Sequence, residues 1–175
     1  MNVLKDKWVL ITGASSGFGA AAARAFGAQG SRLLLGARRV QRLEQAAQAA
    51  LQAGAAEAHY HGLDVTQTPS VEAFMAWARQ RLGSGPSPAP RLDVLINNAG
   101  GAHGLDTVAA AKDEDWEAML QSNVLGVLRV TRAALPLMLN HPGSSIINLG
   151  SLAGRVAYEG GAAYCAAKAG ELQIT

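Results

Sequence analysis

The residues best suited to chemistry stand near the end of the chain, where Tyr164 and Lys168 are four positions apart. In a helix this spacing places both side chains on one face, with an ammonium beside a phenol. A free phenol has a pKa of about 10, and a neighbouring positive charge favours its ionised form. Ser151 follows a short apolar segment at residues 145–149 and adds a hydroxyl. A Tyr-x-x-x-Lys pair alone is a weak signal, and Ser151 strengthens it because it follows an expected strand, where a parallel sheet places its ligand.

A second candidate site is the segment Thr-Gly-Ala-Ser-Ser-Gly-Phe-Gly at residues 12–19. Its glycines permit a tight turn and close approach of a phosphate, and a following helix would present free N–H groups to that phosphate. The spacing Gly-x-x-x-Gly-x-Gly differs from the commoner dinucleotide fingerprint. The pattern favours a bound nucleotide, and a glycine-rich turn without a ligand is the alternative. The contacts are expected from Gly13, Ser15, Ser16, Gly17, Phe18 and Gly19.

Both sites need a scaffold, and short apolar runs alternate with helix-forming stretches along the chain. Strands are expected at residues 8–11, 33–35, 59–63, 92–96 and 145–149, and helices at 17–29, 39–53, 69–82, 113–139 and from 162 onward. Pro136 should bend or locally unwind the long helix, and the proline- and glycine-rich residues 83–90 should form an exposed loop. The alternation predicts an α/β fold, a doubly wound parallel sheet of the Rossmann type in three αβα layers, with strand order 3-2-1-4-5. Its ligand should lie at the carboxyl ends of the strands.

The end of the second expected strand bears on the choice of cofactor. In such folds an acidic residue there holds the ribose hydroxyls of NAD, whereas arginine accommodates the 2′-phosphate of NADP. This sequence has Ala37 followed by Arg38 and Arg39, without a carboxylate. The pattern favours NADP over NAD, with Ser15 or Ser16 adding a hydroxyl. The alternative is that one or both arginines only solvate the start of a helix.

The glycine turn, Ser151 and the Tyr-x-x-x-Lys pair together resemble the short-chain dehydrogenase/reductase family over essentially all 175 residues. The resemblance implies an NADP-dependent oxidoreductase that transfers a hydride between NADP(H) and a secondary alcohol or carbonyl. Tyr164 would be the general acid/base, and Lys168 would ease its ionisation and bind the nicotinamide ribose. Ser151 would hydrogen-bond the substrate oxygen, and Asn123 would hold a water that links Lys168 to solvent.

Two further segments match the family's cofactor-binding positions. Asp64 and Val65 follow the third expected strand, where the family's aspartate meets the adenine amino group; a strand-end cap is nearly as good an explanation. Asn98, Ala99 and Gly100 belong to an Asn-Asn-Ala-Gly segment after the fourth strand. A role in bracing the sheet is at least as well supported there as direct contact with the cofactor.

The resemblance also sets expectations about the whole protein. Gly-Phe-Gly in the turn and the glycine-rich stretch after Asn98 resemble the branch that oxidises 3-hydroxy acids such as serine. We expect residues 1–175 to be a single NAD(P)-binding domain whose later strands are missing, and the full-length form to be a homodimer or homotetramer. The alternative function is a non-catalytic NADP(H)-binding regulator or an inactive truncated remnant.

Composition narrows the class of protein further. Hydrophobic residues make up 49% of the chain and charged residues 16%, which is typical of a globular domain. The net charge of +2 gives little reason to expect a nucleic acid or a membrane as partner. A single cysteine, Cys165, and the absence of an apolar run in residues 1–7 favour a reducing cytoplasm. His59 and His61 lack a third ligand nearby in the sequence, so no metal site is expected.

Overall fold

Five parallel strands form one sheet at the centre of the computed structural model, which describes residues 3–83 and 90–175. The sheet order is β3-β2-β1-β4-β5, which confirms the predicted order within the described part of the chain. The strands differ from the predicted ranges by only a few residues at their ends. They are β1 (Trp8–Thr12), β2 (Arg32–Ala37), β3 (Glu57–Gly62), β4 (Val94–Asn97) and β5 (Ser145–Asn148).

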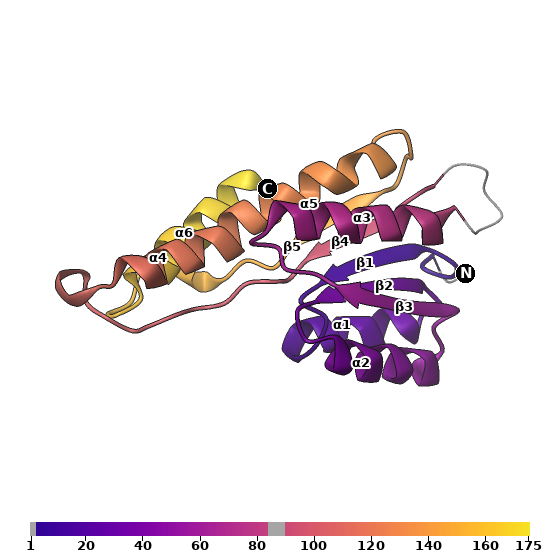
Figure 1. Ribbon diagram of the computed structural model, residues 1–175, viewed down its shortest axis with the longest axis horizontal. Helices are drawn as coiled ribbons and strands as arrows, with labels where there is room; N and C mark the ends of the chain where they lie inside the picture. The colour runs from indigo at the N-terminus through magenta and orange to yellow at the C-terminus, as the bar shows by residue number, and fades with distance from the viewer. Residues whose placement is uncertain (1–2, 84–89) are drawn as a thin grey trace.

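Helices cover both faces of the sheet, as the predicted three-layer architecture requires (Figure 1). One face is covered by α1 (Gly17–Gly27) and α2 (Val40–Ala53), and the other by α3 (Thr68–Leu82) and α5 (Gly126–Ala134). Two more helices, α4 (Asp113–Leu120) and α6 (Ala162–Ile174), pack against each other beyond the strand ends. The arrowheads in Figure 1 point toward this pair, so the helices stand where the fold places its ligand.

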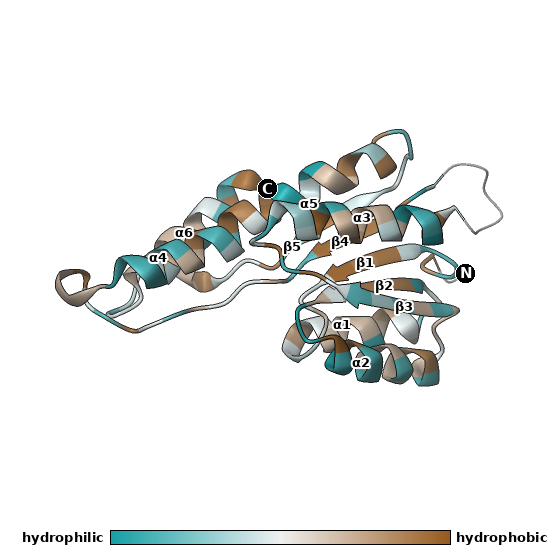
Figure 2. Ribbon diagram, in the orientation of Figure 1, coloured by the Kyte–Doolittle hydropathy of each residue, from teal (hydrophilic) through white to brown (hydrophobic). Residues whose placement is uncertain are grey.

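The core is divided between the two faces by the alternation of side chains along the strands. Leu10 of β1 joins the cluster that contains Phe74 of α3, whereas Val9 and Ile11 join the opposite cluster, which contains Leu43 of α2. All five side chains are almost completely buried. In Figure 2, the greater part of β1 has the colour of hydrophobic residues, while the edge strand β3 carries hydrophilic residues. A central strand buried on both faces fixes the sheet and, with it, the positions of the turns that follow each strand.

The long helix predicted at residues 113–139 is helical as far as Leu137, but a π-helical turn that was not predicted divides it. α4 ends at Leu120, a π-helical turn occupies Gln121–Leu125, α5 ends at Ala134, and a 3₁₀ turn follows at Leu135–Leu137. Asn123 explains the π-helical turn, because its side-chain amide donates to the main-chain oxygen of Met119 at 2.9 Å and competes with the regular ladder. Pro136 has no N–H to continue the ladder, and the 3₁₀ turn at Leu135–Leu137 confirms the local unwinding predicted there.

None of the described helices is long and apolar enough to cross a membrane. The loop expected at residues 83–90 falls mainly on residues 84–89, which lie outside the described part of the chain.

Candidate active site

A groove of about 1460 Å³ opens at the carboxyl ends of the strands, where the fold places its ligands. The groove brings together the turn after β1, the end of β2, the segments after β3 and β4, and part of α6. Nearly all of the residues singled out in the sequence line it. These are Gly13, Ser15, Ser16, Gly17, Phe18, Arg38, Arg39, Asp64, Val65, Asn98, Ala99, Gly100, Ser151, Tyr164 and Lys168.

The turn after β1 is built so tightly that two of its glycines cannot carry a side chain. Gly13 has a φ of +66°, and a Cβ on it would lie 2.7 Å from Asn98 Nδ2. A Cβ on Gly19 would lie 2.5 Å from the main-chain oxygen of Gly13. These two glycines therefore let the turn pack closely against the segment after β4. Gly17, the first residue of α1, lines the groove, and a Cβ on it would meet no atom within 4 Å, so the helix N-terminus is open to a ligand there. Such a turn can hold a phosphate with main-chain N–H groups.

Arg39 reaches across to this turn and contacts both serine hydroxyls. Its Nη2 donates to Ser15 Oγ at 3.1 Å and to Ser16 Oγ at 2.7 Å. Ser16 stands at the N-cap of α1 without capping it through its side chain, so its hydroxyl faces the arginine instead. Arg38 is exposed and also lines the groove. The cluster offers a planar cation and two hydroxyls to a bound anion, which is a suitable donor set for a phosphate.

Asp64 and Asn98 form hydrogen bonds with neighbouring segments around the groove. These contacts are of the kind considered as alternatives to cofactor binding: a cap at a strand end for Asp64 and a brace of the sheet for Asn98. Asp64 Oδ1 accepts hydrogen bonds from Thr66 N at 3.0 Å and from Thr66 Oγ1 at 2.7 Å, closing the turn after β3. Asn98 Nδ2 donates to the main-chain oxygen of Thr12 at 2.8 Å. Thr12 Oγ1 in turn accepts from the main-chain N–H groups of Asn98 and Ala99. These contacts tie β1 to the segment after β4 and fix the floor of the groove.

Ser151, Tyr164 and Lys168 lie along the wall of the same groove. Lys168 Nζ is 5.9 Å from the centre of the Tyr164 ring. Ser151 Oγ accepts a hydrogen bond from Ala153 N at 3.2 Å, which caps the short 3₁₀ helix Leu152–Gly154. Because that contact uses an oxygen lone pair, the hydroxyl proton can still be donated to a ligand. A phenol, an ammonium and a hydroxyl donor therefore face one ligand space.

Asn123 differs from the other predicted catalytic residues because it lies behind the groove lining. Its side chain is 1% exposed, and Nδ2 donates to the main-chain oxygen atoms of Gly101 and Met119, both at 2.9 Å. Oδ1 accepts from Gly101 N at 3.2 Å. The side chain thus locks the segment after β4 onto the π-helical turn. The expected water between Lys168 and solvent stays a prediction.

Lys168 has a partner that the sequence analysis missed. Nζ donates to the main-chain oxygen of Leu149 at 2.7 Å and to Glu171 Oε2 at 2.5 Å. The Glu171 side chain is 2% exposed, and its burial raises the pKa of the carboxyl, although the hydrogen bond and charge of Lys168 act in the opposite direction. The signal was the spacing of three residues from Lys168, which places both side chains on one helix face.

The Glu171→Gln variant should reveal this raised pKa as a pH dependence of folding stability. A pKa above the ordinary 4.5 means that the folded chain binds the proton more tightly than the unfolded chain does. The stability from this group is therefore complete below about pH 4.5 and is lost as the pH rises through the raised pKa. As the pH rises from about 4.5 through the raised pKa of Glu171, the free energy of unfolding of the native chain should fall relative to that of the variant. Urea unfolding from about pH 4 to 8 measures the difference.

The matched control is Glu44→Gln, which removes an exposed carboxylate on α2. The free energy of unfolding of the Glu44→Gln variant should differ from that of the native chain by the same amount at every pH in this range. A constant offset for Glu171→Gln as well would contradict the raised pKa.

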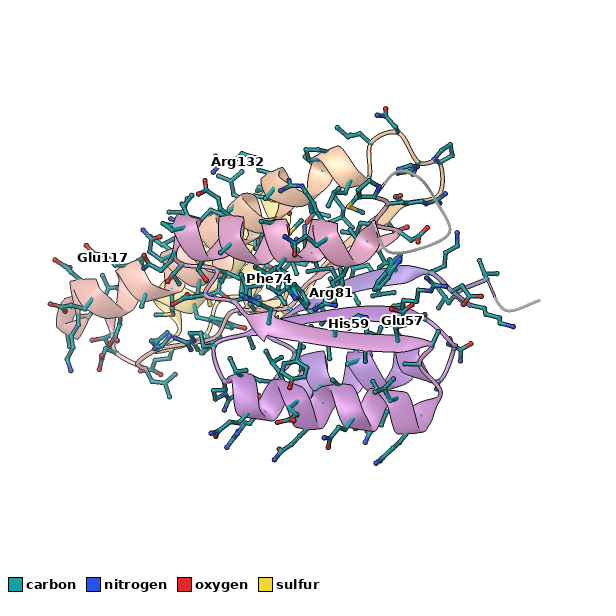
Figure 3. All side chains as sticks on the ribbon, turned by 45° about the vertical axis from the view of Figure 1, so that its right-hand side comes forward. Glu57, His59, Phe74, Arg81, Glu117 and Arg132 are labelled. Atoms are coloured by element: carbon teal, nitrogen blue, oxygen red, sulfur yellow. The ribbon has the colours of Figure 1, made fainter. Side chains whose placement is uncertain are left out.

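Other polar residues in the groove lacked a recognisable pattern in the sequence. His103, Glu114, Glu117, Gln121 and Arg129 line its side near α4 and α5. Arg129 Nη2 donates to Gln121 Oε1 at 2.7 Å. Figure 3 shows Glu117 on α4, at the end of the molecule opposite Glu57. Only the fold brings these residues together, since they come from a loop and two helices.

The histidines of β3 lie away from this groove. His59 Nε2 is 2.9 Å from Glu57 Oε2, and Figure 3 shows both residues on the edge strand. His61 packs against Trp77, with ring centres 5.3 Å apart. Within residues 3–83 and 90–175, no group of three potential metal-binding His, Cys, Asp or Glu side chains is found.

Comparison with known proteins agrees with this geometry. The family model described as short chain dehydrogenase matches residues 7–175. The NADP-dependent 3-hydroxy acid dehydrogenase YdfG of Salmonella typhi is 41% identical over 92% of this chain and 60% of its own length. The chain spans 60–67% of the length of this and another curated relative that it matches.

Two solved structures share the fold and a third or more of the sequence. An alcohol dehydrogenase from the archaeon Thermococcus sibiricus, complexed with 5-hydroxy-NADP, superposes with a TM-score of 0.87 and is 33% identical. The alignment covers 97% of this chain and 68% of that one. Serine dehydrogenase from Escherichia coli gives a TM-score of 0.82 at 36% identity, covering 95% and 72% of the respective chains. The family match over almost the whole sequence is decisive: this chain belongs to the short-chain dehydrogenase family of oxidoreductases.

Proposed function

We propose that the protein containing this chain transfers a hydride between NADP(H) and a secondary alcohol or carbonyl. The observation that carries the proposal is the placement of Tyr164, Lys168 and Ser151 in the same groove as the glycine turn and Arg39. The groove volume of about 1460 Å³ exceeds what a drug-sized ligand needs and suits a dinucleotide together with a small substrate. A 3-hydroxy acid is the narrower substrate class, supported by the names of the relatives.

The residues around the turn fit a phosphorylated dinucleotide. The missing side chain at Gly17 leaves room for a pyrophosphate in the groove, and the N-terminus of α1 favours its negative charge. Arg39, Ser15 and Ser16 would hold the 2′-phosphate. NADP as cofactor is supported by the relatives named for it or crystallised with it. The cofactor, when bound, supplies or accepts the hydride.

Side chains of this chain transfer the proton and stabilise the negative charge that develops on the substrate oxygen. In reduction, Tyr164 donates its phenolic proton to the substrate oxygen as that oxygen becomes negative, and in oxidation it accepts the proton back. Ser151 donates its hydroxyl proton in a hydrogen bond to the same oxygen and holds it beside the phenol. Lys168 stabilises the phenolate left by proton transfer, and its remaining N–H would hold the nicotinamide ribose of a bound cofactor.

Isothermal titration of the purified chain with NADPH and, separately, with NADH at one ionic strength tests the first half of the proposal. NADPH should bind more tightly, because only it presents a 2′-phosphate to Arg39. A folded sample that binds neither cofactor would contradict the proposed site.

Turnover tests the second half of the proposal. We expect NADPH oxidation in the presence of small carbonyl compounds, followed by the loss of nicotinamide absorbance. Cofactor binding without turnover across a panel of carbonyls and alcohols would instead favour the non-catalytic NADP(H)-binding regulator.

A further inference from the structure

The Lys168–Glu171 pair is the one ion pair of the described residues in which both side chains are almost completely buried, at 9% and 2% exposure. Withdrawing two charges from water is costly, and a salt bridge repays that cost only with good geometry. Here the carboxylate oxygen lies 2.5 Å from Nζ. The burial of this carboxylate beside Lys168 therefore indicates that Glu171 has a role in the groove that Lys168 lines.

Glu171 continues the line of side chains that begins with Tyr164. Positions 164, 168 and 171 are four and three residues apart on α6, so they share one face of the helix. Lys168 stands between the phenol and the carboxylate. Since the ammonium has three N–H donors, Leu149 O and Glu171 Oε2 take two and leave one for a ligand in the groove.

Few other charges act on this pair. The elements packed against α6 are α4, the π-helical turn and the 3₁₀ helix Leu152–Gly154. The last two contain no ionisable residue, and Arg155, which follows the 3₁₀ helix, is exposed. α4 faces α6 through Trp116 and Met119. Its residues Asp113, Glu114 and Glu117 are exposed and Asp115 is half-buried; Glu114 and Glu117 line the same groove as Lys168, as does His103. On α6 itself, the ionisable neighbours are Tyr164 and the buried Cys165.

From these contacts we infer that Glu171 is a positioning residue for the proposed reaction. It clamps the Lys168 ammonium against the Leu149 carbonyl, so that the remaining N–H is directed into the groove. Its negative charge also offsets part of the positive charge that Lys168 presents to Tyr164. The inference rests on the proposed function for its catalytic meaning, whereas the clamp itself is a property of the folded chain.

Reductive methylation with formaldehyde and a borohydride reagent tests the clamp without any assay of activity. The Glu171→Gln variant keeps the side-chain shape but loses the charge. A charged acceptor binds an ammonium more strongly than a neutral one. Lys168 should therefore be methylated at least about threefold faster in this variant than in the native chain. Peptide mass spectrometry reads each lysine separately. Lys7, paired with Asp93, and the exposed Lys112 are internal references whose rates should not change. An unchanged Lys168 rate would overturn the clamp.

The dependence of kcat on pH tests the effect on Tyr164. In Glu171→Gln the uncompensated ammonium favours the phenolate more strongly, so the pH-dependent limb governed by this group should move to lower pH by roughly half to one unit. Glu171→Leu removes the acceptor as well, and its kcat should fall about tenfold because the ammonium is no longer held in place. Glu44→Gln should leave the profile unmoved. A Glu171→Gln profile that superposes on the native one would overturn the tuning role.

The two readouts separate failure of this inference from failure of the proposed function. If the native chain neither binds NADPH nor turns over a carbonyl, the proposed function fails, and the methylation rate of Lys168 still decides whether Glu171 holds it. If the native chain is active but both readouts are unchanged in Glu171→Gln, the inference fails and the proposed function stands.

Discussion

Tyr164→Phe should lower kcat for carbonyl reduction by about 10³-fold, within the 10²–10⁴ range typical of lost general acid–base catalysis. The variant deletes one oxygen atom from the groove wall and keeps the aromatic ring in place. Without the phenolic proton, the oxygen that becomes negative during reduction must take its proton from water. Steady-state rates with saturating NADPH, measured from about pH 6 to 9, give the comparison.

Binding should distinguish this loss from damage to the groove. Tyr164→Phe should bind NADPH within about twofold of the native affinity, because the ring and Lys168 remain in place. Tyr60→Phe is the matched control: it deletes the same atom on β3, where Tyr60 packs against the core cluster shared by α1 and α2. It should keep native activity. A Tyr164→Phe variant with more than about a tenth of native kcat would contradict the role of general acid.

The fold could be predicted because its signal is repeated along the chain. Strands β1, β2 and β4 are short apolar runs, and helix-forming stretches alternate with the strands along the chain, so a local error does not change the topology. The site residues could be predicted for a related reason, since the topology places the segment after each strand at one edge of the sheet. The turn at residues 12–19, Arg39 and Ser151 are all found there.

The predicted features that differ from the structure depend on side-chain contacts. A periodic pattern runs through residues 113–139, and it does not show that Asn123 bonds to Met119 and Gly101 and opens a π-helical turn. Glu171 is a similar case, because a Lys and a Glu three residues apart usually form a solvated surface pair of small energetic value. Only the packing of α6 shows that both are buried. Burial of a polar residue is a property of the tertiary structure, and one sequence reports it poorly.

Arg39→Ala should weaken the binding of NADPH by about 10- to 100-fold, which corresponds to the loss of charge-assisted hydrogen bonds to a phosphate. NADH affinity should change by less than about threefold, because NADH has no 2′-phosphate for the guanidinium to hold. The structure supports Arg39 over Arg38 for this contact. Arg39 is already drawn over the turn by Ser15 and Ser16, so less conformational freedom is lost when the phosphate arrives.

The comparison needs variants that separate a specific contact from a general loss of charge. Arg42→Ala removes an exposed guanidinium on the first turns of the same helix, α2, and should weaken NADPH binding by less than about threefold. Raising the ionic strength should narrow the gap between NADPH and NADH in the native chain more than in Arg39→Ala. If Arg39→Ala weakens both cofactors equally, then Arg39 braces the turn through its two serine contacts and does not recognise the phosphate. If Arg38→Ala shows the selective loss instead, the phosphate site shifts by one residue toward β2.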